Sequence, residues 1–265
     1  MVPMGSIAKP SQQQIYLLSV SLGLLTFATP SFALTTELIT NGGFETGDFT
    51  GWTTGEQAGS SGSISVVSGT SGPNSGFTTA GPAAGNFYSV TDQNGPGAYF
   101  LLQPFSLPSA FSGLILSFDM FVNDWSGAGP LCSDLDYNTF FPNQCARVDI
   151  LTNTAGPFST IATDIVASLY VGVDPQGSNP NLYTAYSFAL AGLVGGSTYQ
   201  LRFAQVDNQG INNQGVDNVS LVVTTDTQQV PGPLPLFGVA ATFCYSRKLR
   251  KRIKSRKLPV ASPIV

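Results

Sequence analysis

Histidine is absent from the 265 residues of this chain. Histidine is the base of Ser-His-Asp and Cys-His nucleophilic sites and a common metal ligand, so its absence excludes these designs. A glycosidase needs only two carboxylates, which Asp119, Asp124, Asp134 and Asp136 offer. Acidic residues in Gly-rich loops are usually solvated or cation-bound. We therefore predict that the chain is not an enzyme and keep a glycoside hydrolase as the last alternative.

Basic side chains are scarce over most of the chain. Eight of the eleven Lys and Arg residues lie between positions 247 and 257, and residues 34–229 hold only Arg147 and Arg202. All fifteen Asp and Glu residues lie in 34–229, so two positive against fifteen negative charges give this region a net charge of −13. A region this acidic does not follow a phosphate backbone, which excludes nucleic acid as an expected partner and favours cations.

Cysteine is also rare, with three residues in the chain. Cys132 and Cys145 flank a loop rich in Asp, Asn, Pro and Phe, whereas Cys244 lies near the C-terminus. In an oxidising compartment, two cysteines around a short loop predict a disulfide, which would stabilise the fold by roughly 3 kcal/mol. A zinc site is a poor alternative because no histidine completes the usual ligand set.

No stretch of 34–229 sustains the apolar spacing of a helix, and apolar residues instead alternate with polar ones between turns rich in Gly, Ser, Asn and Pro. For example, Leu114, Leu116, Phe118 and Met120 share one face of a strand. The candidate strands are 37–41, 63–68, 86–91, 98–105, 114–122, 146–151, 164–171, 183–190, 198–206 and 216–224. This pattern predicts an all-β domain, an antiparallel two-sheet sandwich, with an up-and-down barrel as the alternative.

The N-terminus has the pattern of a secretory signal peptide. Lys9 is followed by an apolar stretch from Ile15 to Ala28 and by the small-x-small site Ser31-Phe32-Ala33. We predict that residues 1–33 are a signal peptide and that the mature chain starts near Leu34. A retained membrane helix is the weaker alternative because the apolar stretch is short.

The C-terminus carries three features in order: Pro231-Gly232-Pro233, an apolar run from Leu234 to Tyr245, and a basic block. The run has twelve residues, about 18 Å of helix, against a hydrocarbon core of roughly 30 Å. It is too short for a permanent span. The basic block is expected to stay on the cytoplasmic side; it contains Arg247, Lys248, Arg250, Lys251 and Arg252. Either a weak anchor or a sorting signal fits this pattern.

This C-terminal stretch, 230–257, resembles the PEP-CTERM sorting tail of bacterial exported proteins, with Gly232 in place of the usual Glu; residues 258–265 follow it as a short tail. The resemblance implies cleavage by an exosortase-type membrane protease and an association with secreted polysaccharide. The expected location is therefore outside the cytoplasm: membrane-associated through the C-terminus at first, then cell surface or extracellular.

Two segments resemble galactose-binding-like jelly rolls of carbohydrate-binding modules: residues 38–52 at the start of the domain and 216–221 at its end. The resemblance implies that the first and last strands are adjacent, and that a structural calcium ion lies between them. Glu45 and Asp217 are the candidate ligands, helped by carbonyl groups near Gly43 and Gly47, because calcium prefers hard oxygen ligands. Alternatively, the two carboxylates accept hydrogen bonds from turn amides.

Aromatic side chains in loops are the candidates for stacking on sugar rings. Trp125 lies where a strand leads into a loop, and Tyr137 lies inside the predicted disulfide loop; Trp52 is expected in the core. Three functions therefore remain. We favour a structural or adhesive surface protein associated with secreted polysaccharide, then a carbohydrate-binding module that uses these loop aromatics, then a hydrolase.

Overall fold

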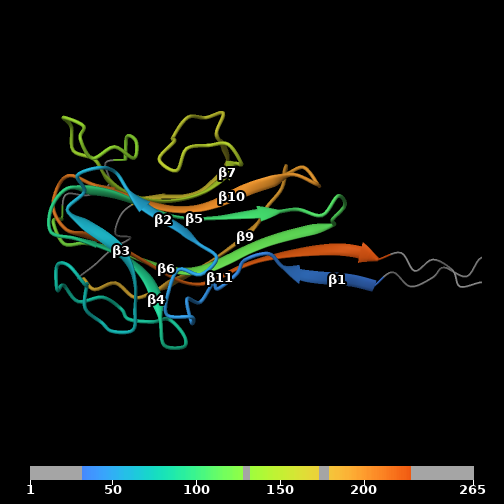
Figure 1. Ribbon diagram of the computed structural model, residues 1–265, viewed down its shortest axis with the longest axis horizontal. Helices are drawn as coiled ribbons and strands as arrows, with labels where there is room; N and C mark the ends of the chain where they lie inside the picture. The colour runs from blue at the N-terminus through green and yellow to red at the C-terminus, as the bar shows by residue number, and fades with distance from the viewer. Residues whose placement is uncertain (1–31, 128–131, 173–178, 228–265) are drawn as a thin grey trace, which may run out of the picture. The chain divides into compact units, whose positions relative to one another are not determined.

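The structure, a computed structural model, describes residues 32–127, 132–172 and 179–227 (Figure 1). The predicted sorting segment (230–257) and all but the last two residues of the predicted signal peptide lie outside these ranges. The described part of the chain forms eleven strands: β1 (Phe32–Glu37), β2 (Thr53–Glu56), β3 (Gly62–Val67), β4 (Tyr88–Gln93), β5 (Gly97–Ser106), β6 (Gly113–Asp124), β7 (Gln144–Thr152), β8 (Ile165–Gly172), β9 (Thr184–Ala189), β10 (Thr198–Asp207) and β11 (Asn212–Thr227).

The strands form two antiparallel sheets that pack face to face. One sheet has the order β3-β4-β11-β6-β9, with β1 paired to the far half of β11, and the other has the order β2-β5-β10-β7-β8. The predicted all-β, two-sheet antiparallel sandwich is confirmed, and the barrel alternative is wrong. The predicted adjacency of the first and last strands is also confirmed, since Phe32 pairs with Thr227 and Glu37 with Val222.

The core lies between the sheets and follows the alternation in the sequence. The inward residues of β6 are those expected to share a face, Leu114, Leu116, Phe118 and Met120, and none is more than 2% exposed. Trp52 also lies in this core, as expected, with its ring 6.2 Å from that of Phe203.

The first predicted strand, 37–41, is wrong. The strand ends at Glu37, whose carboxylate accepts hydrogen bonds from the backbone N–H groups of Leu38 and Ile39 and so closes a turn. The chain then crosses to the other sheet, where Thr40 donates its N–H to Gln103 of β5. Strand β2 was not predicted, because Thr53–Glu56 contains no apolar alternation.

Within the described ranges, no helix has the length and apolar character needed to cross a bilayer. The apolar run expected to contact the membrane, Leu234 to Tyr245, is outside those ranges.

Candidate functional site

The turns that carry the candidate residues gather at one end of the sandwich, which we call the loop end. Strands β6 and β10 finish there, at Asp124 and Asp207, while β7 and β11 begin there, at Gln144 and Asn212. β11 then runs for 16 residues to Thr227 at the opposite, terminal end, a length of roughly 50 Å. Figure 1 shows β1 and the last part of β11 extending together from the sandwich as a two-stranded ribbon.

A disulfide joins Cys132 to Cys145 at the loop end, with 5.2 Å between their Cα atoms, as expected from the sequence. The loop that it closes is also held by amide side chains. Asn143 Nδ2 donates to the carbonyl oxygens of Asp134 and Asp136, at 3.2 and 2.9 Å. Asn208 Nδ2, from the β10–β11 turn, donates to the carbonyl oxygen of Phe141 at 2.9 Å. This loop is therefore tied at several points along its backbone.

Phe140 and Phe141 lie on this tied loop and point into solvent, with 95% and 72% of their surface exposed. Their rings pack edge to face, with centroids 5.6 Å apart. No core contact explains two adjacent exposed phenylalanines on a braced backbone. The sequence places them in a loop rich in Phe, but a Phe-Phe pair does not indicate whether its rings are buried or exposed.

Tyr137 and Trp125, the predicted glycan contacts, are both partly committed to the protein. The hydroxyl group of Tyr137 donates to the carbonyl oxygen of Ala58 at 2.7 Å, which fastens the disulfide loop to the β2–β3 turn. The indole N–H of Trp125 donates to Asn213 Oδ1 at 3.0 Å, and its ring lies 4.7 Å from that of Phe77. Both side chains are half-buried, and both stay predicted contacts.

Glu45 and Asp217, the candidate calcium ligands, both face the segment 83–87. Glu45 accepts hydrogen bonds from the N–H groups of Asn86 and Phe87, which lower the pKa of its carboxyl group. Asp217 Oδ2 accepts the N–H groups of Ala83 and Ala84, at 2.8 and 3.2 Å, while its burial raises its pKa.

These hydrogen bonds are the ones expected if the two carboxylates bind turn amides and not calcium. A cation could use only the lone pairs that the amides leave free. No cluster of three or more acidic, Cys or His side chains suited to a metal occurs in the described ranges. Calcium at Glu45 and Asp217 stays a prediction.

The four carboxylates considered for hydrolysis have different surroundings. Asp119 accepts a hydrogen bond from Asn218, Asp124 lies buried at the loop end, and Asp134 and Asp136 belong to the disulfide loop. A hydrogen bond from the Gln57 side chain holds the pKa of Asp136 below its usual value.

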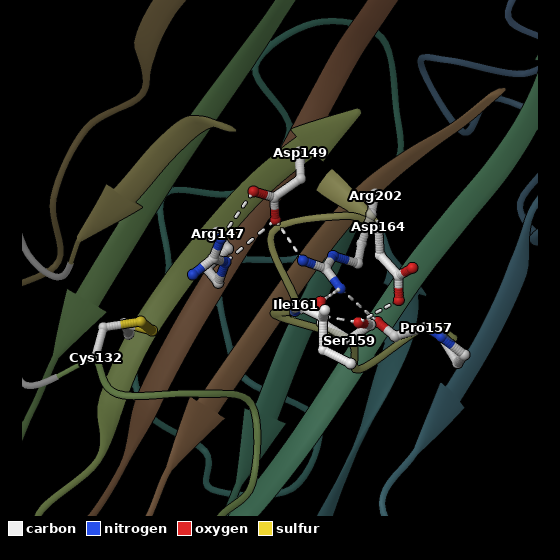
Figure 2. Close-up of polar contacts among 9 residues, drawn as sticks. Cys132, Arg147, Asp149, Pro157, Ser159, Ile161, Asp164 and Arg202 are labelled. Atoms are coloured by element: carbon white, nitrogen blue, oxygen red, sulfur yellow. Dashed lines mark hydrogen bonds and ion pairs between the residues drawn. A yellow bond between two sulfur atoms is a disulfide. The ribbon is translucent and has the colours of Figure 1, made fainter. Parts of the chain in front are cut away.

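Both basic side chains of the described residues bind the same carboxylate on the outer face of the second sheet. Figure 2 shows Asp149 between Arg147, at 2.9 Å, and Arg202, at 2.6 Å. Arg202 is fully buried, and this burial lowers the pKa of its guanidinium group. Since both guanidinium groups are held at Asp149, neither pairs with a carboxylate at the loop end.

No family model and no curated protein match the chain. Several solved structures resemble it. One is a carbohydrate-binding module in complex with beta-1,4-galactotriose, with a TM-score of 0.43, 13% identity and coverage of 70% of this chain and 97% of that one. A Stig cyclase from Fischerella sp. TAU has a TM-score of 0.43, 15% identity and coverage of 74% and 100%. An adhesin domain of Lys-gingipain from Porphyromonas gingivalis has a TM-score of 0.42, 16% identity and coverage of 72% and 99%. The similarity is remote. The fold of this chain therefore rests on its own strand pairing.

Proposed function

We propose that the chain is an exported, non-catalytic protein of the cell surface or extracellular matrix that associates with secreted polysaccharide through its loop end. The observation that supports this most is the exposed pair Phe140 and Phe141 on a loop that a disulfide and two asparagines hold in place. An aromatic face suits the apolar face of a pyranose ring.

The size of this contact predicts weak binding by a single module. An aromatic side chain can bury roughly 150–250 Å², so covering about half of each ring removes on the order of 200 Å² from water. At about 25 cal/mol per Å² this contributes about 5 kcal/mol, before the cost of association is subtracted. Once that cost is subtracted, the Kd of a single module is expected to be about millimolar or weaker, so useful retention requires many modules on one polymer.

The position of the chain ends supports the same proposal. Phe32 and Thr227 are paired neighbours at the terminal end, roughly 50 Å along β11 from the loop end. If the segment after Thr227 attaches the protein to a membrane or to a surface, the exposed rings lie at the far end of the sandwich from that attachment.

We further propose that both ends of the chain are processed. The pattern of 1–33 supports a signal peptide. Sorting by an exosortase-type membrane protease is supported by residues 230–257, where Pro231-Gly232-Pro233 is followed by an apolar run and a basic block. The net charge of −13 over 34–229 supports a partner other than nucleic acid.

Affinity electrophoresis tests the binding proposal directly. The purified protein is run in native gels that contain the exopolysaccharide of the producing cells, β-glucan, β-galactan or xylan. We expect retardation by at least the native exopolysaccharide, and its loss in a Phe140→Ser/Phe141→Ser variant. Val194→Ser is the matched control, because Val194 is 63% exposed but belongs to the turn before β10 at the terminal end.

Three results would count against this function. They are migration unchanged by the native exopolysaccharide, equal retardation of the Phe140→Ser/Phe141→Ser variant, and binding to phosphatidylcholine vesicles with the same dependence on the two rings. The last result would make the pair a membrane contact. Trp125→Ala in the same gels tests whether the second predicted contact contributes.

A further inference from the structure

The interior of the sandwich changes from apolar to polar toward the loop end. On β10, the inward residues Leu201 and Phe203 are followed by Gln205 and Asp207. The neighbouring strands change in the same way, with Asp124 ending β6, Gln144 starting β7, and Asn212 and Gln214 starting β11. All of these polar residues are buried, and Gln144, Gln205, Asp207 and Asn212 are 0% exposed.

Side-chain hydrogen bonds cross between the sheets in this layer. Gln93 of β4 donates through Nε2 to Asp207 Oδ2 at 2.6 Å, and Gln205 donates through Nε2 to Gln93 Oε1 at 3.2 Å. The β10–β11 turn also contributes, since the N–H groups of Gln209 and Gly210 donate to Asp207 Oδ1 at 2.7 and 3.2 Å. Asp207 is thus fixed in position and cut off from water.

The carboxylate of Asp207 has no basic partner among the described residues. Burial is the main reason that the pKa of Asp207 rises to about 6, and the charge of Asp124 raises it further. Arg147 and Arg202 cannot help, because both bind Asp149 on the outer face of the second sheet (Figure 2). At neutral pH the carboxylate of Asp207 is therefore ionised at a cost in stability.

Asn212 gives an independent sign that a polar group belongs in this layer. It stands opposite Asp124 in the β6–β11 pair and faces the interior with it. The side chain is 0% exposed, and neither its Oδ1 nor its Nδ2 has a hydrogen-bond partner among the described residues. A buried amide group left unpaired destabilises the folded state, so its environment normally supplies a partner.

Gln144 contributes a second oxygen. Ser126 Oγ lies 2.6 Å from Asp124 Oδ1 and 3.0 Å from Gln144 Oε1, but a hydroxyl group has one proton. That proton goes to the nearer acceptor, Asp124 Oδ1. Turning the Gln144 amide lets its unpartnered Nε2 donate to Ser126 Oγ and leaves Oε1 free to accept.

We propose that Asp207, Asn212 and Gln144 supply oxygen ligands to a calcium ion buried between the two sheets at the loop end, where Asp124 adds negative charge. Calcium takes hard carboxylate and amide oxygens and completes its shell with water. The ion would offset the charge of Asp207 and give Asn212 a partner. This site is separate from the predicted one at Glu45 and Asp217, which faces the segment 83–87.

Isothermal titration of the chelator-treated protein with CaCl2 at pH 7.5 tests the proposal. A Glu45→Gln background weakens the other predicted site, so that the remaining binding reports on this layer. We expect binding in that background, and an affinity at least tenfold lower after Asp207→Asn or Asn212→Ala. Asn212→Asp should raise the affinity, because it adds a carboxylate at the same place.

Circular dichroism checks that each variant folds. If Asp207→Asn does not fold, the calcium affinity of Asn212→Ala decides the test. Absence of calcium binding in the Glu45→Gln background overturns the proposal. The proposal is also overturned if the calcium affinity of Asn212→Ala, and of every other folded variant, stays within twofold of that of the Glu45→Gln protein. Since none of these measurements involves polysaccharide, this proposal and the proposed function fail independently.

Discussion

Arg202 Nη2 lies 2.6 Å from Asp149 Oδ2, and both side chains are completely buried although they project from the outer face of a sheet. The segment 153–164 covers them. Arg202 Nη1 donates to the carbonyl oxygens of Pro157 and Ser159, at 2.9 and 2.7 Å, so one guanidinium group joins β10, β7 and the covering segment (Figure 2).

Replacing Arg202 with Met should destabilise the protein by about 3 kcal/mol or more. The change leaves a buried carboxylate with one partner fewer and removes the donor to two partly buried carbonyl oxygens. Urea unfolding followed by circular dichroism measures the loss, and limited proteolysis should show earlier cleavage within 153–164. Arg147→Met is the control, with a smaller expected loss because, among the described residues, the Arg147 guanidinium group hydrogen-bonds to Asp149 alone. Equal stability of Arg202→Met and the unmodified protein would contradict this role.

Alternation in the sequence predicted the sheets because one face of each strand is apolar. The adjacency of the first and last strands was implied by the resemblance to galactose-binding-like jelly rolls, and Trp52 was expected in the core as a large apolar side chain. Alternation predicted the inward residues of β6. It did not predict the polar layer, because Asp207 and Asn212 carry no hydrophobic signal and normally indicate a turn. The sequence also did not predict that Arg202 is buried, because the segment that covers it is more than forty residues away in the chain.

The exposed pair at Phe140 and Phe141 marks a third limit of the sequence. Aromatic residues usually indicate core, and only the structure shows that this loop leaves them outside. Conversely, Tyr137 appeared suited to a ligand but donates its hydroxyl group to Ala58. Which aromatic side chain is free depends on hydrogen bonds between distant turns.

Gly42→Ala should destabilise the protein by at least about 2 kcal/mol. A Cβ at this position would lie 1.8 Å from the carbonyl oxygen of Val219, which is backbone and cannot rotate away. The N–H of Val219 also donates to the carbonyl oxygen of Gly42 at 3.0 Å, so the two backbone segments cannot move apart without losing this hydrogen bond. Gly69→Ala is the control, since nothing lies within 4 Å of its added Cβ. Similar melting temperatures of the two variants would show that the contact can relax.

Reduction of the Cys132–Cys145 disulfide should lower the free energy of unfolding by roughly 3 kcal/mol. Cys145 belongs to a small buried cluster with Leu135 and Val206, so loosening the loop also disturbs this packing. Denaturant unfolding with and without dithiothreitol measures the effect. A Cys132→Ala/Cys145→Ala variant should not respond to the reductant. A response of that variant would assign the effect to something other than this disulfide.

Asn208→Ala should weaken polysaccharide binding more than it weakens the fold. Asn208 Nδ2 holds the carbonyl oxygen of Phe141, and Asn208 Oδ1 accepts the N–H of Asn143 at 2.7 Å, so its loss frees the backbone under the two rings. Hydrogen exchange should rise in residues 139–143, and retardation in the native gels should fall. Gln209→Ala is the control from the same turn, because the Gln209 side chain contacts only Asn208. Unchanged exchange in Asn208→Ala would show that the disulfide and Asn143 hold the loop without Asn208.

The intact mass of the protein recovered from its native cells should correspond to a chain that starts at Leu34 and has lost the basic block. Removal of Phe32 and Ala33 takes away the partners of Thr227 and Asp226, while Leu34 to Glu37 keep their pairing with β11. Asp226 and Thr227 then have no partner on β1, which favours access of a protease to the following segment that contains Pro231-Gly232-Pro233. Replacing the small residue Ala33 with Arg should block the first cleavage and retain the leader in the measured mass. A native protein that carries both the leader and the residues from Arg247 onward would refute export and sorting together.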